Sequence, residues 1–294
     1  MKLILSRKGF DTENGRCPSP IFPNGKLCSL PIPDCDSNIR YDDIRYGDMN
    51  IGEIVENLTR RRQPQNRIAP ESRAHLDPDI NYEAYPREKG WQPLFGQGKG
   101  HQTHLSDQGV QIGDLFLFFG LFQKVKKTSG KWCFVKDASR QHILWGWLQI
   151  GEIHKVNELT QDQLSWTRYH PHLQYLQYPE PYPNNTLYIA SEVLDLGNGP
   201  IKPGAGLFPN FHERLVLTDP EGSEVTDWRL PRCFYPDESK CPLTHFPDLN
   251  NNWNQNDKYA YACRKGPGQE FVLDLDQYPD VTDWLVQSIF THDC

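Results

Sequence analysis

The strongest constraint on the fold comes from two apolar blocks in the middle of the chain, residues 112–120 and 142–153. Both are rich in aromatic and β-branched residues, and glycines stand at or near their ends. This composition suits a buried pleated surface, so the blocks predict two strands of one sheet. The segment between them, Lys124 to Arg140, is polar and has Ser129-Gly130 near its centre, which predicts a long hairpin loop. No other stretch is as apolar, and we expect the rest of the chain to pack around this pair.

The flanking segments predict short elements. Lys2 to Ser6 predicts a buried first strand that ends in charged residues. Apolar residues at helical spacing after Asp48 predict a helix capped by that aspartate. The glycine-rich stretch from Trp91 to Leu105 predicts a loop, and its lack of a Gly-Lys-Ser/Thr ending argues against a phosphate-binding loop. Pro279 to Phe290 has one apolar face and predicts a helix.

Composition agrees with a chain built from many short pieces. The 294 residues include 24 prolines and 22 glycines, and the aromatic residues are spread along the whole sequence. Such a chain can form ordered loops around an aromatic core and is unlike a disordered segment. We therefore expect residues 1–294 to form a single α+β domain. It should be strand-rich, with a central, mostly antiparallel sheet, either open or barrel-like, and a few peripheral helices.

Net charge and cysteine usage limit the binding partners and the cellular compartment that we expect for this protein. The net charge of −7 excludes a general polyanion-binding surface. The eight cysteines form no C-x-x-C pair, so a zinc ribbon is not expected. No signal peptide opens the sequence and no run reaches the length of a membrane span. These features predict a cytoplasmic protein with reduced thiols and no membrane partner.

Carboxylates and cations provide the first set of candidate site residues. Four carboxylates lie at predicted strand ends or beside glycine turns: Asp11, Asp77, Asp79 and Glu270. A pair of them can serve as acid and base, or as nucleophile, at a glycosidic bond. Arg7 and Lys8 can hold a phosphate or a developing anion. Each residue alone is more often a structural cap or ion pair, but together they recur beside apolar strands.

Histidines provide a second set. His75-Leu76-Asp77, with one distant histidine, matches the ligand types of an iron oxygenase triad. The third ligand stays open among His142, His170, His172, His212 and His245. The simpler interpretation is that Asp77 and Asp79 cap a proline-containing turn. His170-Pro171-His172 can bind a substrate or a metal, or form a packed loop pair. The preferred site therefore carries no metal ligand, and the sequence specifies no cofactor.

Several of these motifs occur in an order that resembles a known family. They are residues 5–11, Ser19-Pro20-Ile21, residues 30–33, residues 74–79, Phe95-Gly96-Gln97, residues 113–120, residues 146–152, His170-Pro171-His172 and residues 268–272. Over nearly the whole chain they look like the third family of nucleotide modification associated domains. The resemblance implies an α+β domain of bacterial or phage type that modifies nucleotides or DNA bases, with no assigned reaction. By motif, it implies these site residues: Arg7, Asp11, His75, Asp77, Asp79, Gln97, His104, His170, His172, Gln269 and Glu270.

Three functional hypotheses follow from the sequence. The first is an enzyme acting on a nucleotide or a DNA base, as a transferase or hydrolase at a nucleotide or glycosidic bond. In it Asp11, His75, Asp77 and Glu270 are catalytic, and the substrate is bound by Arg7, Lys8, Asp79, Gln97, His104, His170, His172 and Gln269. The second is a non-catalytic reader of modified bases, because residues 113–152 also resemble the small barrels associated with pseudouridine synthases. In such a reader Trp145 or Trp147 would stack a base, although both are expected in the core. The third is an iron-dependent oxygenase that uses His75 and Asp77. Protein partners are left open.

Overall fold

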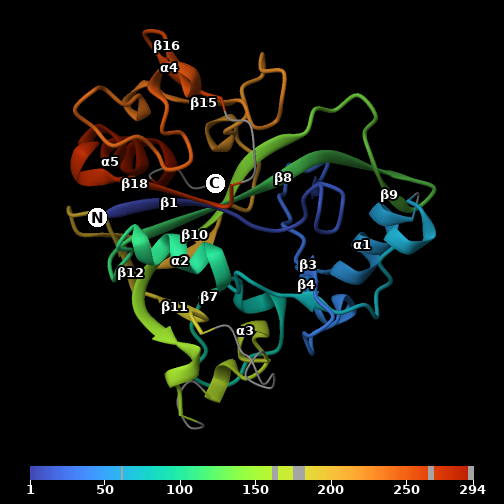
Figure 1. The fold of residues 1–294 in the computed structure, drawn as a ribbon. Helices are drawn as coiled ribbons and strands as arrows, with labels where there is room; N and C mark the ends of the chain where they lie inside the picture. The colour runs from blue at the N-terminus through green and yellow to red at the C-terminus, as the bar shows by residue number, and fades with distance from the viewer. Residues whose placement is uncertain (61, 161–164, 175–182, 264–267, 291–294) are drawn as a thin grey trace.

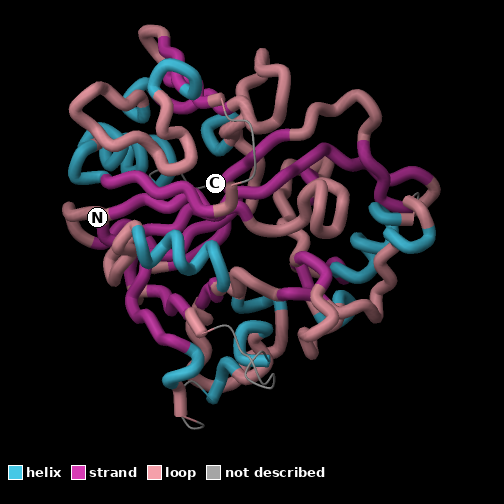
Figure 2. Tube along the Cα trace, in the orientation of Figure 1, coloured by secondary structure: helices cyan, strands magenta, loops and turns pink. Residues whose placement is uncertain are grey.

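The computed structural model describes residues 1–60, 62–160, 165–174, 183–263 and 268–290. Figure 1 shows two long strands crossing the molecule, with a helix in front of the sheet and the C-terminal segments gathered on one side. Figure 2 shows that strands and loops make up most of this structure and that helices are short and peripheral. This is the α+β architecture expected from the sequence. None of the described helices is both long and apolar enough to cross a membrane.

Within the described residues, the main sheet contains nine strands. Its path follows the order β18 (Glu270–Asp274), β1 (Lys2–Arg7), β8 (Leu115–Thr128), β10 (Gln141–Lys155), β11 (Thr186–Ala190) and β7 (Leu94–Gln97). Beside this path, β14 (Ala205–Leu207) pairs with β10, while β2 (Ser19–Ile21) and β9 (Lys131–Phe134) pair with β8. The pairs β1–β8 and β2–β8 are parallel, and the other pairs are antiparallel, as predicted for most of the sheet.

The two apolar blocks form the centre of this sheet. β8 and β10 pair in an antiparallel register from Leu115↔Gln149 to Phe122↔Gln141. The predicted hairpin is confirmed, but its loop is shorter than expected because β8 continues through Lys124 to Thr128 and pairs with β9 across the Ser129-Gly130 turn. Polar residues can extend a strand beyond the buried part of a sheet, and a hydrophobic pattern does not detect that extension.

The sheet is curled but not closed. Among the described strands the hydrogen-bonded path ends at β18 on one side and at β7 on the other. The curl nevertheless brings these two edges close together, since Gln97 of β7 donates a side-chain hydrogen bond to Glu270 of β18 at 2.6 Å. The charged end of β1 lies between them, because Lys8 also contacts Glu270. Both edges and the end of β1 therefore meet in one place.

Short elements surround the sheet. The helices are α1 (Ile51–Thr59), α2 (Lys99–Asp107), α3 (Pro171–Gln174), α4 (Leu249–Asn252) and α5 (Pro279–Trp284), the last continued by a π-helical turn over Leu285–Phe290. The small sheets pair β3 (Ile32–Pro33) with β6 (Ala74–His75), β4 (Arg45–Tyr46) with β5 (Met49–Asn50), and β12 (Val193–Asp195) with β13 (Pro200–Pro203). A further sheet contains β15 (Trp228–Pro231), β17 (Tyr259–Ala262) and β16 (Trp253–Gln255).

Two local predictions are wrong. The stretch from Trp91 to Leu105 is not a loop, because it holds β7 and most of α2. A strand therefore precedes this glycine-rich turn and a helix follows it, although the Gly-Lys-Ser/Thr ending is still missing. Helix α1 is capped by Asn50, whose side chain accepts a hydrogen bond from the Glu53 N–H, and not by Asp48. Both errors concern boundaries, where glycine and cap residues allow more than one structure.

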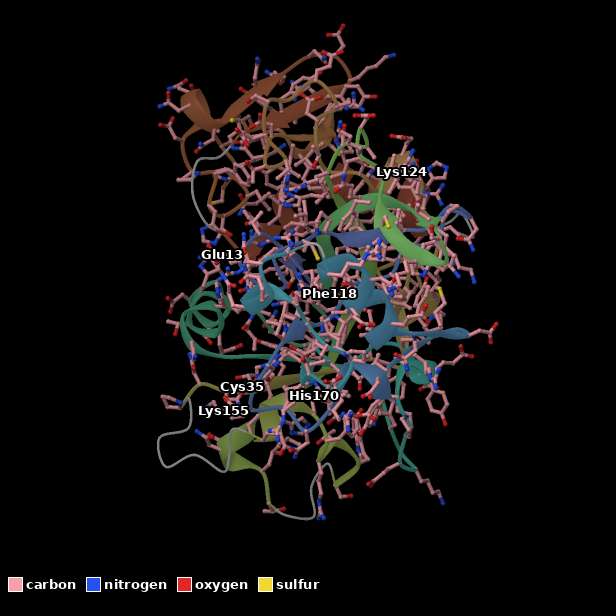
Figure 3. All side chains as sticks on the ribbon, turned by 90° about the vertical axis from the view of Figure 1, so that its right-hand side faces the viewer. Glu13, Cys35, Phe118, Lys124, Lys155 and His170 are labelled. Carbon is pink, nitrogen blue, oxygen red and sulfur yellow. The ribbon has the colours of Figure 1, made fainter. Side chains whose placement is uncertain are left out.

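The core is aromatic, as the composition suggests. The largest apolar cluster joins both faces of the main sheet and includes residues from Leu3 to Phe290. Figure 3 shows side chains packed around Phe118 in the interior, whereas Glu13 and Lys124 are exposed. A second cluster packs around α1 and the N-terminal segment. Trp145 and Trp147 are each only 6% exposed, so neither offers the stacking surface that the base-reader hypothesis assigned to them.

Candidate active site

A cavity of about 600 Å³ opens where the two sheet edges meet. Its size falls within the range of roughly 300–1,000 Å³ that is typical of small-molecule sites. Nine of the twelve predicted site residues line it: Arg7, Lys8, Asp11, His75, Asp77, Gln97, His104, His172 and Gln269. They come from six separate segments of the chain, so the fold brings together groups that are far apart in the sequence.

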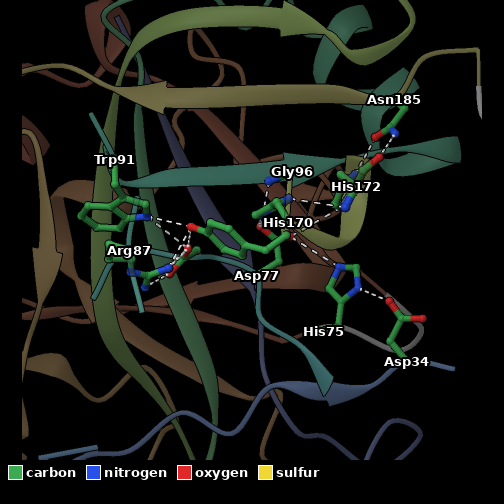
Figure 4. A network of polar contacts seen from close by, with 11 residues as sticks. Asp34, His75, Asp77, Arg87, Trp91, Gly96, His170, His172 and Asn185 are labelled. Carbon is green, nitrogen blue, oxygen red and sulfur yellow. Dashed lines mark hydrogen bonds and ion pairs between the residues drawn. The ribbon is translucent and has the colours of Figure 1, made fainter. Parts of the chain in front are cut away.

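Asp77 lies at the centre of a group of imidazoles (Figure 4). The Nε2 atoms of His75 and His172 are 3.7 and 3.6 Å from its Oδ2 atom, and Nε2 of His170 is 3.3 Å from its Oδ1 atom. Ligand-type atoms of His75, Asp77 and His172 all lie within 4.8 Å of one another. The carboxylate is thus approached by two rings on one oxygen and by a third ring on the other.

A second layer of contacts holds these groups in place (Figure 4). Nδ1 of His75 bonds Asp34 Oδ2 at 2.7 Å, and Nδ1 of His172 bonds Asn185 Oδ1 at 2.5 Å. The backbone N–H of Gly96 donates to Asp77 Oδ1 at 2.8 Å. Because the Nδ1 atoms of His75 and His172 are bonded to Asp34 and Asn185, the Nε2 atom of each ring is directed toward Asp77 Oδ2.

Three elements supply this arrangement. The β3–β6 pairing, with Ile32 opposite His75, places one imidazole beside the cavity. Helix α3 begins at Pro171 and places His172 against β7. β7 passes so close that a Cβ atom on Gly96 would lie 2.3 Å from Cδ2 of His172. Glycine at this position is therefore required by the position of the imidazole ring.

The local electrostatics differ between the rings. Burial works to lower the pKa of His75, but the bonds to Asp34 and Asp77 outweigh it and raise that pKa to about 9. Burial lowers the pKa of His172 to about 3, because the Asp77 carboxylate, which raises this pKa, is opposed by the neighbouring His75 and His170. Burial alone would raise the pKa of Asp77, but the surrounding histidines hold it well below its ordinary value. Asp77 is therefore an ionised carboxylate in a nearly dry environment.

A buried ion pair forms another wall of the cavity. Lys8 Nζ lies 2.8 Å from Glu270 Oε1, the same oxygen that accepts the hydrogen bond from Gln97. The lysine ammonium also lies 4.5 Å from the centre of the Phe95 ring. Within the described part of the chain, Glu270 Oε2 is buried and has no hydrogen-bond partner. Glu270 supports Lys8 and Gln97, which line the cavity, but is not itself one of the lining residues.

Arg7, Asp11 and His104 form a further part of the cavity lining. The Arg7 guanidinium lies 3.7 Å from Asp11, whose other oxygen accepts hydrogen bonds from the backbone N–H groups of Glu13 and Asn14. His104 contacts the Thr244 hydroxyl at 3.2 Å. Asp11 therefore orders a loop and positions Arg7, while the start of α2 borders the same space through Gly98, Lys99 and Gly100.

Two further predicted residues do not line the cavity. Both carboxylate oxygens of Asp79 are bound by Arg87, at 2.6 and 2.5 Å, and the hydroxyl of Tyr169 also donates to Asp79. This carboxylate is 1% exposed and forms a buried ion pair with Arg87, which lies away from His75 and His172 in Figure 4. His170 is fully buried and does not line the cavity, but it contacts two residues that do, Asp77 and His172.

Sequence reasoning missed the residues that hold the histidines. Asp34 and Asn185 lie beside prolines or polar neighbours in stretches with no apolar periodicity, so nothing in the sequence distinguished them. Lys99 and His101 also line the cavity, although only Gln97 and His104 of the stretch 91–105 were predicted as site residues. The glycine content of that stretch was the one usable signal, since glycine permits close approach of the backbone to another group.

The comparison with protein families agrees with this organisation. The sequence profile of the family described as nucleotide modification associated domain 3 matches residues 2–274, which include every residue of the cavity. No curated protein and no solved structure matches the chain. Because the match covers most of the 294 residues, the chain belongs to the nucleotide modification associated domain 3 family.

Proposed function

We propose that this protein is an enzyme that modifies a nucleotide or a nucleic-acid base, and that Asp77, His75 and His172 form its reacting centre. The observation that carries the proposal is the convergence of these three residues with Arg7 and Lys8 on one cavity of about 600 Å³. The family supports a role connected with nucleotide modification. The cavity supports a small or extruded substrate, such as a free nucleotide or a base flipped out of DNA.

The distribution of charge supports the same substrate class. The ionised Asp77 with its imidazoles lines one part of the cavity, and Arg7, Lys99 and the start of α2 line another part of its rim. Cations and a helix N-terminus favour a phosphate group. A nucleotide placed with its phosphate at this rim would direct its base or its glycosidic bond toward Asp77. Transfer to the base and hydrolysis of the glycosidic bond both need an acid and a base at that place.

Expression in a host cell tests this proposal, because the cell supplies cosubstrates. The wild-type protein and the Asp77→Asn variant are expressed separately, and mass spectrometry measures the nucleoside composition of host DNA, RNA and the free nucleotide pool. We expect an altered nucleoside in one of these pools with the wild-type protein and none with Asp77→Asn. The Asp257→Asn variant, which changes an exposed carboxylate outside the cavity, should behave like the wild type.

Binding measurements with purified protein complete the test. Nucleoside monophosphates and short single-stranded and duplex DNA are titrated at low salt. Unchanged nucleoside pools together with no binding to any of these probes would refute the proposal. Binding of modified DNA without any product would favour the base-reader hypothesis.

A further inference from the structure

We propose that His75, Asp77 and His172 bind one divalent transition-metal ion on the wall of the cavity. The ligand atoms are Nε2 of each histidine and Oδ2 of Asp77, which lie 3.7 and 3.6 Å apart in the two histidine–carboxylate pairs. The inference depends on the proposed function only for the location of the substrate, and metal binding can be measured without any substrate.

The distances fit ligands around an ion. A hydrogen bond from an imidazole N–H to a carboxylate is normally about 2.7–3.2 Å long, shorter than either separation here. Metal–ligand bonds of about 2.0–2.2 Å place neighbouring ligand atoms roughly 3.0–3.5 Å apart in octahedral or tetrahedral geometry. Each histidine–carboxylate pair therefore needs to contract by only a few tenths of an ångström, and all three ligand atoms already lie within 4.8 Å of one another. Two imidazoles and one carboxylate form a common donor set for Fe²⁺, and a related set serves catalytic Zn²⁺.

The surrounding contacts are those of a metal site. Metal-binding histidines usually donate their other ring N–H to a carboxylate or an amide oxygen, which fixes the ring. Asp34 Oδ2 is the acceptor for His75, and Asn185 Oδ1 is the acceptor for His172. Asp77 is oriented in the same way, since Oδ1 accepts the Gly96 N–H and faces His170, so that Oδ2 is directed toward the other two rings.

Charge balance agrees with a divalent cation. A metal ion displaces any proton from its imidazole ligands, so in the metal-bound form the protein groups of the cluster and its supporting residues carry two negative charges, one on Asp77 and one on Asp34. Two carboxylates in a largely buried position require a compensating charge of about +2. A single M²⁺ ion supplies it at the point where the three ligand atoms converge.

The cluster also has an open side. His75, Asp77 and His172 all line the cavity, while the supporting residues Asp34 and Asn185 do not. A metal held by three protein ligands would therefore present its remaining coordination positions to the substrate space, the arrangement of a catalytic ion. Such an ion can activate water or O₂ or polarise a substrate oxygen.

The competing explanation is an ion-pair cluster in which a proton on His75 bridges Asp34 and Asp77 without any metal. This explanation accounts for the contacts of His75. It gives no function to His172, which lies 3.6 Å from the same carboxylate oxygen and is held there by Asn185 and by the close approach of Gly96. The convergence of a second anchored ring on Oδ2 favours the metal site.

The test measures metal binding directly. Purified full-length protein is stripped with a chelator and then titrated with Fe²⁺ under anaerobic conditions, and separately with Mn²⁺, Zn²⁺ and Co²⁺. Bound metal is counted by mass spectrometry after removal of free ions, and Co²⁺ absorption in the visible range reports on the ligand geometry. We expect one equivalent of at least one of these ions and a higher melting temperature in its presence. The relative affinities of the four ions identify the metal.

Variants locate the site. Asp77→Asn and His172→Gln should weaken binding by at least about 100-fold, and Asn185→Ala, which removes a supporting residue, by about 10–100-fold. His154→Gln changes a partly exposed histidine outside the cavity and should bind like the wild type. Circular dichroism confirms that each variant is folded, and the Co²⁺ spectrum of the wild type gives the ligand type if a variant does not fold.

The outcomes separate this inference from the proposed function. Less than one tenth of an equivalent of every ion in the wild type, or equal affinity in the wild type and the folded Asp77→Asn and His172→Gln variants, would overturn the metal site. One bound equivalent with unchanged nucleoside pools would support the metal site and count against the proposed substrate. Nucleoside modification that is unaffected by the chelator, with no metal bound, would support the proposed function alone.

Discussion

At the scale of single residues, three histidines with little solvent exposure differ in the groups that hold them. His75 has carboxylates near both ring nitrogens, and His172 has an amide on one side and a carboxylate on the other. His142 instead accepts a hydrogen bond at Nδ1 from the Trp228 indole N–H at 3.0 Å and packs among aromatic rings. The same residue type is thus found at the candidate reacting centre and in the apolar core.

The burial of His142 leads to a prediction about the stability of the protein at acid pH. Burial, with a smaller effect of Arg7, lowers its pKa to about 3. The folded pKa is therefore below the ordinary value of about 6.5, so the unfolded chain binds a proton more readily than the folded chain. The contribution to stability is complete above about pH 6.5 and is lost as the pH falls toward 3. His142→Gln should reduce the slope of this loss by up to about 1.4 kcal/mol per pH unit.

Urea unfolding between pH 7 and pH 4 measures this slope. The comparison uses the slope and not the absolute stability, because glutamine also changes the packing around Trp228. Parallel pH profiles for the wild type and His142→Gln would show that protonation of this ring does not limit acid stability.

At the scale of elements, the candidate site depends on where β1 and β7 end and where β18 begins. The first strand was predicted from its apolar run, and it delivers Arg7 and Lys8 to the cavity as expected. β18 delivers Glu270. β7 was missed because only its first two residues are large and apolar, and because Gly96 and Gly98 resemble loop residues. Its place in the sheet comes from pairing with β11, a contact between distant segments.

The contact between Lys8 and Glu270, which connects these strands, leads to a prediction about stability. Lys8 and Glu270 are a buried pair, with side chains 7% and 0% exposed, that connects the end of β1 to β18 and through Gln97 to β7. Lys8→Met leaves a buried carboxylate without its cation, and Glu270→Gln leaves a buried cation without its carboxylate. Each single variant should lose about 3–5 kcal/mol of unfolding free energy. The double variant should lose clearly less than the sum of the two.

Denaturant unfolding of the four proteins forms a double-mutant cycle. The matched control is Glu158→Gln, which removes one partner of the exposed Lys155–Glu158 pair and should cost less than about 1 kcal/mol. Additive losses in the cycle would mean that Lys8 and Glu270 do not depend on each other. The sequence alone assigned Glu270 a catalytic role, whereas its burial gives it at least a structural one.

At the scale of the whole molecule, the order of strands connects the two ends of the chain. β1 near the N-terminus lies between β8 from the middle of the sequence and β18 near its end. The largest apolar cluster contains residues from Leu3 to Phe290. We therefore propose that the chain folds as a single domain, and we expect one cooperative unfolding transition.

Two probes test this expectation. Tryptophan fluorescence and far-ultraviolet circular dichroism should give coincident unfolding curves, and calorimetry should give one peak. A separate early transition, assigned to the cluster around α1, would contradict the proposal and indicate two domains.

The sequence by itself determined the elements that carry a strong local pattern. The apolar blocks fixed β8 and β10, because a long run of aromatic and β-branched residues is stable only in the centre of a sheet. Asp114, at the start of β8, accepts backbone hydrogen bonds from Lys2 and Gln111, in agreement with its position before a strand. The motifs also identified the family, and nine of the twelve predicted site residues line the cavity.

Only the tertiary structure decided which of these residues act together. Asp77 and Asp79 are two positions apart in the sequence, yet one faces the cavity histidines and the other forms a buried pair with Arg87. The supporting role of three residues depends on the packing of β3, β7 and α3 against one another; they are Asp34, Gly96 and Asn185. Side-chain direction, burial and the distance between ligand atoms depend on contacts between distant segments. Local sequence patterns do not encode those contacts, since they report on the residues of one segment at a time.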